Sequence, residues 1–93
     1  MFGYEWDEKK ARINLKDHKV SFDEGTTIFD DLFHASIFDV EHSLDEDRYI
    51  SIGRSIKDRV LVVVHTERGE TTRIISCRKA TPDEREKYEK GNY

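Results

Sequence analysis

The side chains that could do chemistry gather in the second half of the chain. Residues 48–79 hold eight Lys or Arg residues against three acids, and His65 lies in the same stretch. Cleavage of RNA without a metal needs a base for the ribose 2′-hydroxyl, an acid for the leaving 5′-oxygen and cations for the charge on phosphorus. Histidine and arginine suit these tasks, because histidine titrates near neutral pH and the planar arginine side chain binds phosphate oxygens in pairs.

We therefore assign candidate roles within this stretch. The predicted catalytic residues are His65 as acid or base, Arg78 at the transition-state phosphate, and Tyr49. The predicted RNA-binding residues are Arg54, Arg73, Lys79 and, on the closing helix, Tyr88. Tyr49 or Tyr88 would stack on a base. The competing interpretation is structural, since neither a histidine in a strand nor a solvated surface of mixed charge needs a function.

Metal ions, cofactors and a cysteine nucleophile are not expected. The histidines show no His-x-x-x-His spacing and there is no Cys-x-x-Cys pair; the four are His18, His34, His42 and His65. Cys77 lies in the middle of a strand-like segment, where a thiol is usually a small buried hydrophobic group. A single cysteine also excludes an internal disulfide and is typical of a reducing compartment.

Three strand-like segments must position the candidate residues. Residues 48–55, 59–66 and 71–78 are rich in Ile, Val and Thr, and turns at 57–58 and 68–69 separate them. Connections this short predict an antiparallel meander. Residues 32–47 are expected to form a loop in which 35–38 is the only short strand, which makes three to four strands in all.

Helices are expected on both sides of the meander. Asp7 opens a helix over 7–18, and a capping box over 21–24 opens a second, short helix that ends at Asp30. A third helix begins at 81–84, with Thr-Pro-Asp-Glu, and ends at Gly91. Trp6 and Phe2 should seal the core. The order predicts an α+β domain with two N-terminal helices, an antiparallel sheet and a C-terminal helix.

Pairing the strands through their two turns sorts the side chains by face. One face is almost wholly apolar and should lie under the N-terminal helices: Ile50, Ile52, Val60, Val62, Val64, Ile75 and Cys77. The other face is apolar in the middle and polar at its ends: Tyr49, Ser51, Gly53, Leu61, Val63, His65, Thr72, Ile74, Ser76 and Arg78. His65, Tyr49 and Arg78 are therefore expected to share one face.

Length, composition and charge limit the class of protein. Residues 1–93 are expected to form one domain with a small core, because 35% of them are apolar and 39% charged. A cytoplasmic location is expected, since the start turns acidic before an apolar run forms and no segment reaches the length of a membrane span. Residues 20–47 carry nine acids and no Lys or Arg, whereas residues 48–79 sum to +5, which makes the second stretch the candidate nucleic-acid patch.

Two parts of the chain resemble a known family. They are 4–7 (YEWD) with 18–24 (HKVSFDE), and 52–55 (IGRS) with 61–66 (LVVVHT) and 73–80 (RIISCRKA). In order and spacing they resemble the BrnT ribonuclease toxins of bacterial type II toxin–antitoxin pairs. The resemblance implies a RelE-like fold, sequence-relaxed RNA cleavage that arrests growth, and a BrnA-type antitoxin whose complex represses its own operon. Lys19 departs from the family, which usually has glycine there; a left-handed lysine costs about 1 kcal/mol.

The combined interpretation is a metal-independent endoribonuclease toxin that leaves a 2′,3′-cyclic phosphate. RNA is its substrate, a BrnA-type antitoxin is its partner, and operator DNA is contacted only through their complex. The acidic run 20–47 would lie away from RNA and meet basic parts of the antitoxin. The alternative is a non-enzymatic interaction module of a DNA-binding regulatory complex, which needs the basic sheet but no titrating residue.

Overall fold

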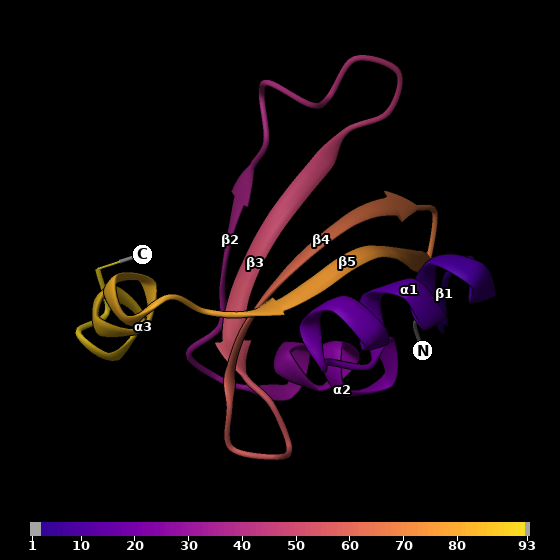
Figure 1. Ribbon diagram of the computed structural model, residues 1–93. Coiled ribbons are helices and arrows are strands. Elements are labelled where there is room, and N and C mark those ends of the chain that lie inside the picture. The colour runs from indigo at the N-terminus through magenta and orange to yellow at the C-terminus, as the bar shows by residue number, and fades with distance from the viewer. Residues whose placement is uncertain (1–2, 93) are drawn as a thin grey trace.

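A five-stranded sheet organises the chain, and helices pack against both of its faces (Figure 1). The computed structural model describes residues 3–92. In chain order its elements are β1 (Gly3–Glu5), α1 (Glu8–His18), α2 (Phe22–Thr26), the 3₁₀ turn η1 (Thr27–Asp30), β2 (Ala35–Phe38), β3 (Arg48–Arg54), β4 (Val60–Arg68), β5 (Thr71–Lys79) and α3 (Pro82–Glu89). The strand order in the sheet is β1-β5-β4-β3-β2.

The helices begin at the predicted capping residues. The Asp7 carboxylate accepts the N–H groups of Lys9 and Lys10 at the start of α1, and the Ser21 hydroxyl accepts the N–H of Glu24 in α2. Thr81 and Glu84 form a complete capping box on α3. These bonds satisfy N–H groups that have no partner within the helix, which explains why α1, α2 and α3 begin at these positions.

The predicted meander is confirmed, and one further strand joins it. β2, β3, β4 and β5 pair antiparallel in sequence order. β1 pairs in parallel with β5, with Gly3 opposite Thr71 and Glu5 opposite Arg73. Three residues of the N-terminal segment show no periodic pattern, so this edge strand was not predicted. It brings Glu5 beside the arginines of the sheet.

A β-bulge between β4 and β5 changes the predicted faces. Val64 lies opposite Ser76, but the next residue, His65, lies opposite Ile74, so one extra residue of β5 has no partner. After the bulge, Ser76, Cys77 and Arg78 each lie on the face of the sheet opposite to the one predicted for them. Arg78 therefore shares a face with its ladder partner Val62 and not with His65, and the prediction that His65 and Arg78 lie together was wrong.

The N-terminal helices cover the face that carries His65, which is the opposite of the prediction. Seven buried residues form the core on this side: Val20, Phe22, Ile28, Leu61, Val63, Ile74 and Cys77. Trp6 packs edge-on against Phe22 as expected, whereas Phe2 lies outside the described residues. Gly25 allows α2 to approach the sheet closely, because a Cβ there would lie 2.3 Å from the Cys77 Sγ. Cys77 is buried as predicted, but on this face, and burial raises the pKa of its thiol to about 12.

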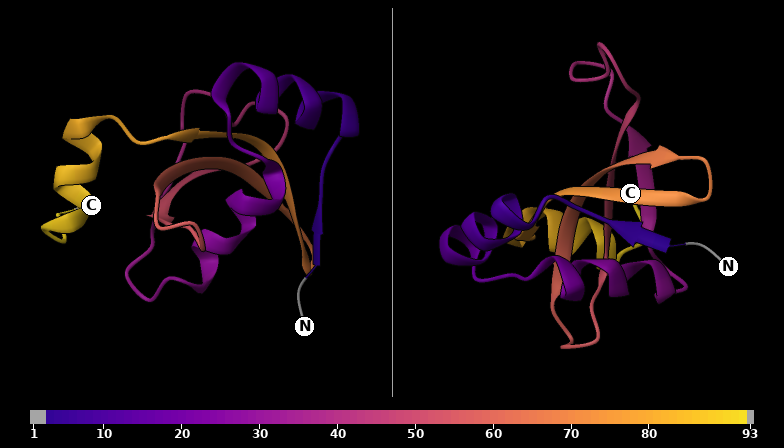
Figure 2. Two further views of the ribbon diagram at one scale, coloured as in Figure 1. Left: turned by 60° about the horizontal axis from the view of Figure 1, so that its bottom comes forward. Right: turned by 90° about the vertical axis from the view of Figure 1, so that its right-hand side faces the viewer.

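The other face of the sheet is covered only in part. Tyr88 of α3 packs there against Ile52, Val60 and Val62, while Ile50 remains half-buried. In Figure 2 (left) α3 stands apart from α1 and α2. We call this side the open face and the side under α1 and α2 the helix-covered face.

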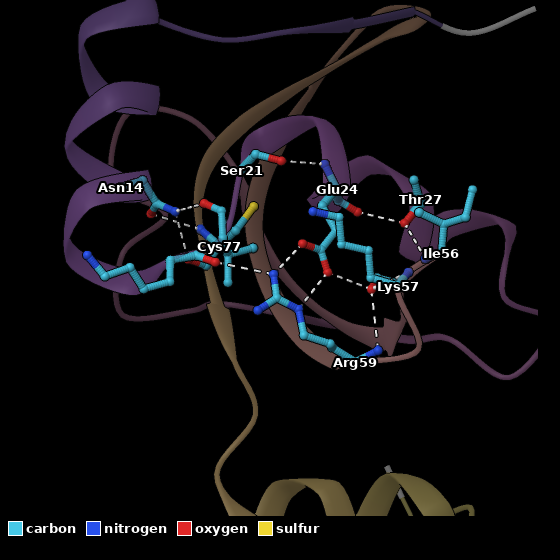
Figure 3. Close-up of polar contacts among 11 residues, drawn as sticks. Asn14, Ser21, Glu24, Thr27, Ile56, Lys57, Arg59 and Cys77 are labelled. Carbon is cyan, nitrogen blue, oxygen red and sulfur yellow. Dashed lines mark hydrogen bonds and ion pairs between the residues drawn. The ribbon is translucent and has the colours of Figure 1, made fainter.

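A polar network ties the helices to the sheet (Figure 3). The Asn14 amide donates to the carbonyls of Val20 and Cys77 and accepts the Cys77 N–H. The buried Glu24 carboxylate accepts hydrogen bonds from Arg59, which lower its pKa. Glu24 therefore does not complete the predicted capping box of α2, because Arg59 engages its carboxylate. None of the helices within residues 3–92 combines the length and the apolar character needed to cross a membrane.

Candidate functional site

Arginines are the main polar side chains of the open face. The strand register places Arg54 opposite Val60, and it places both Arg48 and Arg73 opposite Thr66. Together with Arg78, these arginines come from β3 and β5, the two strands on either side of β4. Paired residues share a face of a sheet, so the open face collects these four arginines.

Each of the three predicted arginines on this face has a carboxylate partner. Arg73 donates to Glu5 at 2.6 Å, and Arg54 donates to Asp58 at 3.1 Å and to Glu89 at 3.4 Å. Arg78 is held most firmly: it donates to both oxygens of Glu84, at 2.7 and 2.9 Å. A bidentate pair of this kind fixes the plane of the guanidinium group.

Glu84 connects Arg78 to the start of α3. Its carboxylate accepts the Thr81 N–H as half of the capping box, in addition to the two bonds from Arg78. Chiefly through the Arg78 hydrogen bonds, the pKa of Glu84 falls to about 2. The Arg78 side chain is still 41% exposed, so a phosphate oxygen in solution can approach it.

A cleft of about 650 Å³ lies beside α3 at the end of β3. Its lining includes His34, Arg54, Tyr88 and Lys90, together with the exposed Phe33. The Arg54 guanidinium lies 5.9 Å from the centre of the Tyr88 ring, in cation–π contact. The cleft thus combines a cation, an aromatic side chain and a histidine within one concave surface.

Asp31 orders three groups of this cleft. The Tyr88 hydroxyl and the Arg54 backbone N–H both donate to its carboxylate, and the His34 Nδ1 donates to its backbone carbonyl at 2.7 Å. Burial raises the pKa of Asp31, but the bonds from Tyr88, Arg54 and Phe33 outweigh this effect, so its net pKa is lowered. Burial and then Asp31 raise the pKa of Tyr88. Tyr88 is therefore a hydrogen-bond donor and not a base.

His34 is a candidate that sequence reasoning missed. It lies in the loop before β2, where no periodic pattern predicts its direction. Because its Nδ1 donates to a carbonyl, the Nε2 of the neutral ring is the nitrogen able to accept a proton. The isolated Gly53 was the available sequence signal for a neighbouring side chain here, because glycine within a strand often marks a place where another group approaches the backbone closely. A Cβ at Gly53 would lie 3.0 Å from the Cβ atoms of His34 and Ile28.

His65 lies on the helix-covered face and is only 4% exposed. Its Nδ1 donates to Glu67 at 2.6 Å, and its Nε2 therefore accepts from the Ser51 hydroxyl at 2.7 Å. The ring stacks on Tyr49 at 5.8 Å and meets the edge of Phe29 at 5.1 Å. Burial lowers the pKa of His65 despite the Glu67 carboxylate.

The predicted residues therefore separate into two groups. Arg54, Arg73, Arg78 and Tyr88 belong to the open face. His65 and Tyr49 lie on the helix-covered face, and the register places Lys79 opposite Leu61 on that side as well. Tyr88 is 9% exposed, which leaves little of its ring for the predicted stacking on a base, whereas Phe33 in the same cleft is 79% exposed. Among residues 3–92, no three His, Cys, Asp or Glu side chains group closely enough to hold a metal ion.

Comparison with known proteins points to one family. Residues 6–84 match the family model described as "Ribonuclease toxin, BrnT, of type II toxin-antitoxin system". The fold is similar to the crystal structure of the Brucella abortus ribonuclease toxin BrnT, with a TM-score of 0.64 over 87% of this chain and 99% of that chain. The two are 20% identical in sequence, so this likeness concerns the fold. No curated protein matches the chain.

Proposed function

The chain belongs to the BrnT family of ribonuclease toxins of type II toxin–antitoxin systems, and we propose that it cleaves RNA without a metal ion, in the cleft beside α3. The observation that carries this proposal is the cleft in which Arg54, Tyr88 and His34 meet around Asp31. Arg78 shares the open face with Arg54 and is oriented by Glu84 of α3. These side chains provide a proton acceptor and fixed cations, which are the groups that metal-free cleavage needs.

In the proposed reaction His34 acts on the ribose. Its Nε2 takes the proton of the 2′-hydroxyl, and the 2′-oxygen then attacks the neighbouring phosphorus. The bond from phosphorus to the 5′-oxygen breaks, the 5′-oxygen takes a proton from solvent, and a 2′,3′-cyclic phosphate remains. Arg54 and Arg78 stabilise the charge on the phosphate oxygens, because preorganised donors are strongest where charge develops. Phe33 offers an exposed ring on which a base can stack.

His65 and Tyr49 have no place in this proposal. They lie on the opposite side of the sheet from Arg78, and neither of them lines the cleft beside α3. Both His65 ring nitrogens have partners, Ser51 and Glu67, and the ring is buried. We propose that His65 holds the ends of β3 and β4 together.

Membership of a type II system implies an antitoxin partner and an RNA substrate. We propose that the antitoxin is of the BrnA type, that the complex works in the cytoplasm, and that operator DNA is bound only by the complex. The paired arginines of the open face are the observation that favours the alternative, a non-enzymatic interaction module. Arg54, Arg73 and Arg78 each already have a carboxylate partner, which a phosphate would have to displace or join.

RNA cleavage in EDTA tests the proposal. Purified toxin should cut a defined RNA, and end-group analysis should find 2′,3′-cyclic phosphate. Cleavage that disappears in EDTA and returns with Mg²⁺ would contradict the metal-free reaction. A folded protein that cuts no RNA under either condition would support the interaction module.

A further inference from the structure

The sheet ends at β2 in an edge that no other described strand covers. β2 pairs with β3, and the strand order places it last in the sheet. The Asp39 N–H donates to the Arg48 carbonyl, so the alternation of an antiparallel ladder turns the backbone groups of Ser36 and Phe38 outward. An edge of this kind is a template for pairing with another extended segment. Figure 1 shows the loop after β2 projecting beyond the rest of the sheet.

Large apolar side chains continue along this edge and its loop. Ile37 is 48% exposed, Phe38 45%, Val40 74% and Leu44 89%. We call these four residues the apolar edge. Single exposed apolar residues are ordinary, but a run of them along a free strand marks an interaction surface.

The charge around the apolar edge selects the partner. Residues 39–47 contain five acids and no Lys or Arg. This charge repels RNA, and two copies of the chain paired through β2 would bring both acidic loops to one interface. A basic protein segment is attracted instead, and complementary charge favours encounter with it.

We propose that the β2 edge binds an extended, basic segment of the antitoxin, which adds to the sheet as a further strand. Main-chain hydrogen bonds to Ser36 and Phe38 would give affinity. Alternate apolar side chains of the added strand would pack on the apolar edge, and its Lys or Arg residues would meet the acidic loop. The inference rests on the antitoxin partner of the proposed function, and none of the four residues of the apolar edge lines the cleft in which RNA is cut.

Amide exchange in the complex of this toxin with its own antitoxin tests the pairing. The amide hydrogens of Ser36 and Phe38 should exchange at least tenfold more slowly in the complex than in the free toxin. Equal exchange rates in the two states would overturn strand addition. If both amides exchange slowly in the free toxin, and light scattering shows that the free toxin is a dimer, then the edge pairs with a second copy of the chain. This result would also overturn the proposal.

Substitutions matched for exposure test the apolar edge. Ile37→Lys and Val40→Lys should each weaken antitoxin binding about tenfold or more, since interface hot spots cost at least that much. Their controls are Leu15→Lys and Ile56→Lys, because Leu15 is 49% exposed and Ile56 80% exposed on other surfaces. The controls should bind within about twofold of wild type. Equal effects of edge and control substitutions would contradict the proposal.

RNA cleavage by the same variants separates this inference from the proposed function. Without antitoxin, Ile37→Lys and Val40→Lys should cut RNA as wild type does, because neither residue lines the cleft. If neither the wild-type protein nor the variants cut RNA, the proposed function fails. The antitoxin-binding result still tests whether the β2 edge binds the antitoxin. If RNA is cut but the edge variants bind antitoxin normally, only the edge inference fails.

Discussion

At the scale of single residues, two histidines lie in contrasting surroundings: His34 is exposed in the cleft beside α3, and His65 is buried. His65 lies in a strand-like stretch rich in cations and was therefore the predicted acid or base, but it is buried between Phe29 and Tyr49 with both nitrogens engaged. No catalytic role was predicted for His34, which lies in a loop, yet it lines the cleft with Arg54 and Tyr88. Residue types suggested the chemistry, but the direction in which each side chain points depends on the pairing of the strands and on the loop before β2.

His34→Gln should remove one limb of the pH profile of cleavage. Glutamine hydrogen-bonds but does not titrate, so the variant should also cut RNA on the order of 100-fold more slowly, as expected for loss of a general base. Initial rates between pH 5 and 9 in EDTA measure both effects. His42→Gln is the control, because His42 is exposed in the loop after β2. A His34→Gln profile that keeps its shape and height would show that His34 is not the base.

His65→Gln should change stability with pH and not the pH profile of cleavage. Burial lowers the pKa of folded His65 below its usual value near 6.5, so its contribution to stability is present above that value and is lost as pH falls toward the folded pKa. Urea unfolding at a series of pH values from 5 to 8 should show wild type losing stability toward acid. The variant should lose less over this range, whatever its overall stability. Parallel curves for the two proteins would refute this structural role.

At the scale of elements, sequence signals predicted the helices and strands whose hydrogen bonds join residues close in sequence. The caps at Asp7, Ser21 and Thr81 and the two tight turns predicted three helices and a meander, all of which the structure contains. The bulge on β5 left no such signal, because adjacent Ile74 and Ile75 suit either face equally well. Because one residue of β5 is unpaired, Cys77 and Arg78 each lie on the face opposite to the one predicted. β1 was missed because its pairing with β5 depends on contacts distant in sequence.

The end of α1 offers a stability test. Lys19 has a φ of 59° at the helix C-cap, a left-handed conformation that costs lysine about 1 kcal/mol and glycine almost nothing. Lys19→Gly should therefore raise the free energy of unfolding, by about 0.5–1 kcal/mol because glycine also gains freedom in the unfolded chain. Lys16→Gly, at an exposed position inside the same helix, should lower it by about 1 kcal/mol. If both substitutions destabilise the protein in chemical denaturation, the left-handed strain is not real.

At the scale of the whole molecule, charge and apolar surface are divided between separate regions. The open face carries the arginines, while residues 39–47 carry five acids beside the apolar edge. One antitoxin could thus bind β2 and reach the cleft, or act from β2 alone. The buried clusters of so small a chain are thin, so a partner that binds only the folded toxin should stabilise it noticeably.

Antitoxin should raise the melting temperature of the toxin. A partner present at about 100 times its dissociation constant adds about 2.7 kcal/mol to the free energy of unfolding, which for a domain of this size is a shift of roughly ten degrees or more. Thermal scans of toxin with increasing antitoxin measure the shift. The Ile37→Lys variant should show a smaller shift at the same concentrations, since its affinity is lower. Equal shifts for both toxins would argue that the edge does not contribute to binding.

The central claim is that RNA is cut in the cleft beside α3, where Arg54 lies, with Arg78 on the same side of the sheet as Arg54, and cleavage rates of three arginine variants in EDTA test it most directly. Arg54→Ala and Arg78→Ala should each slow cleavage on the order of 100-fold or more, comparable to the loss of one preorganised donor. Arg12→Ala removes an exposed arginine from α1, away from the cleft, and should cut within about threefold of wild type. Thermal unfolding of each variant confirms that the fraction compared is folded. Folded Arg54→Ala and Arg78→Ala proteins that cut RNA as fast as Arg12→Ala would place the active site elsewhere.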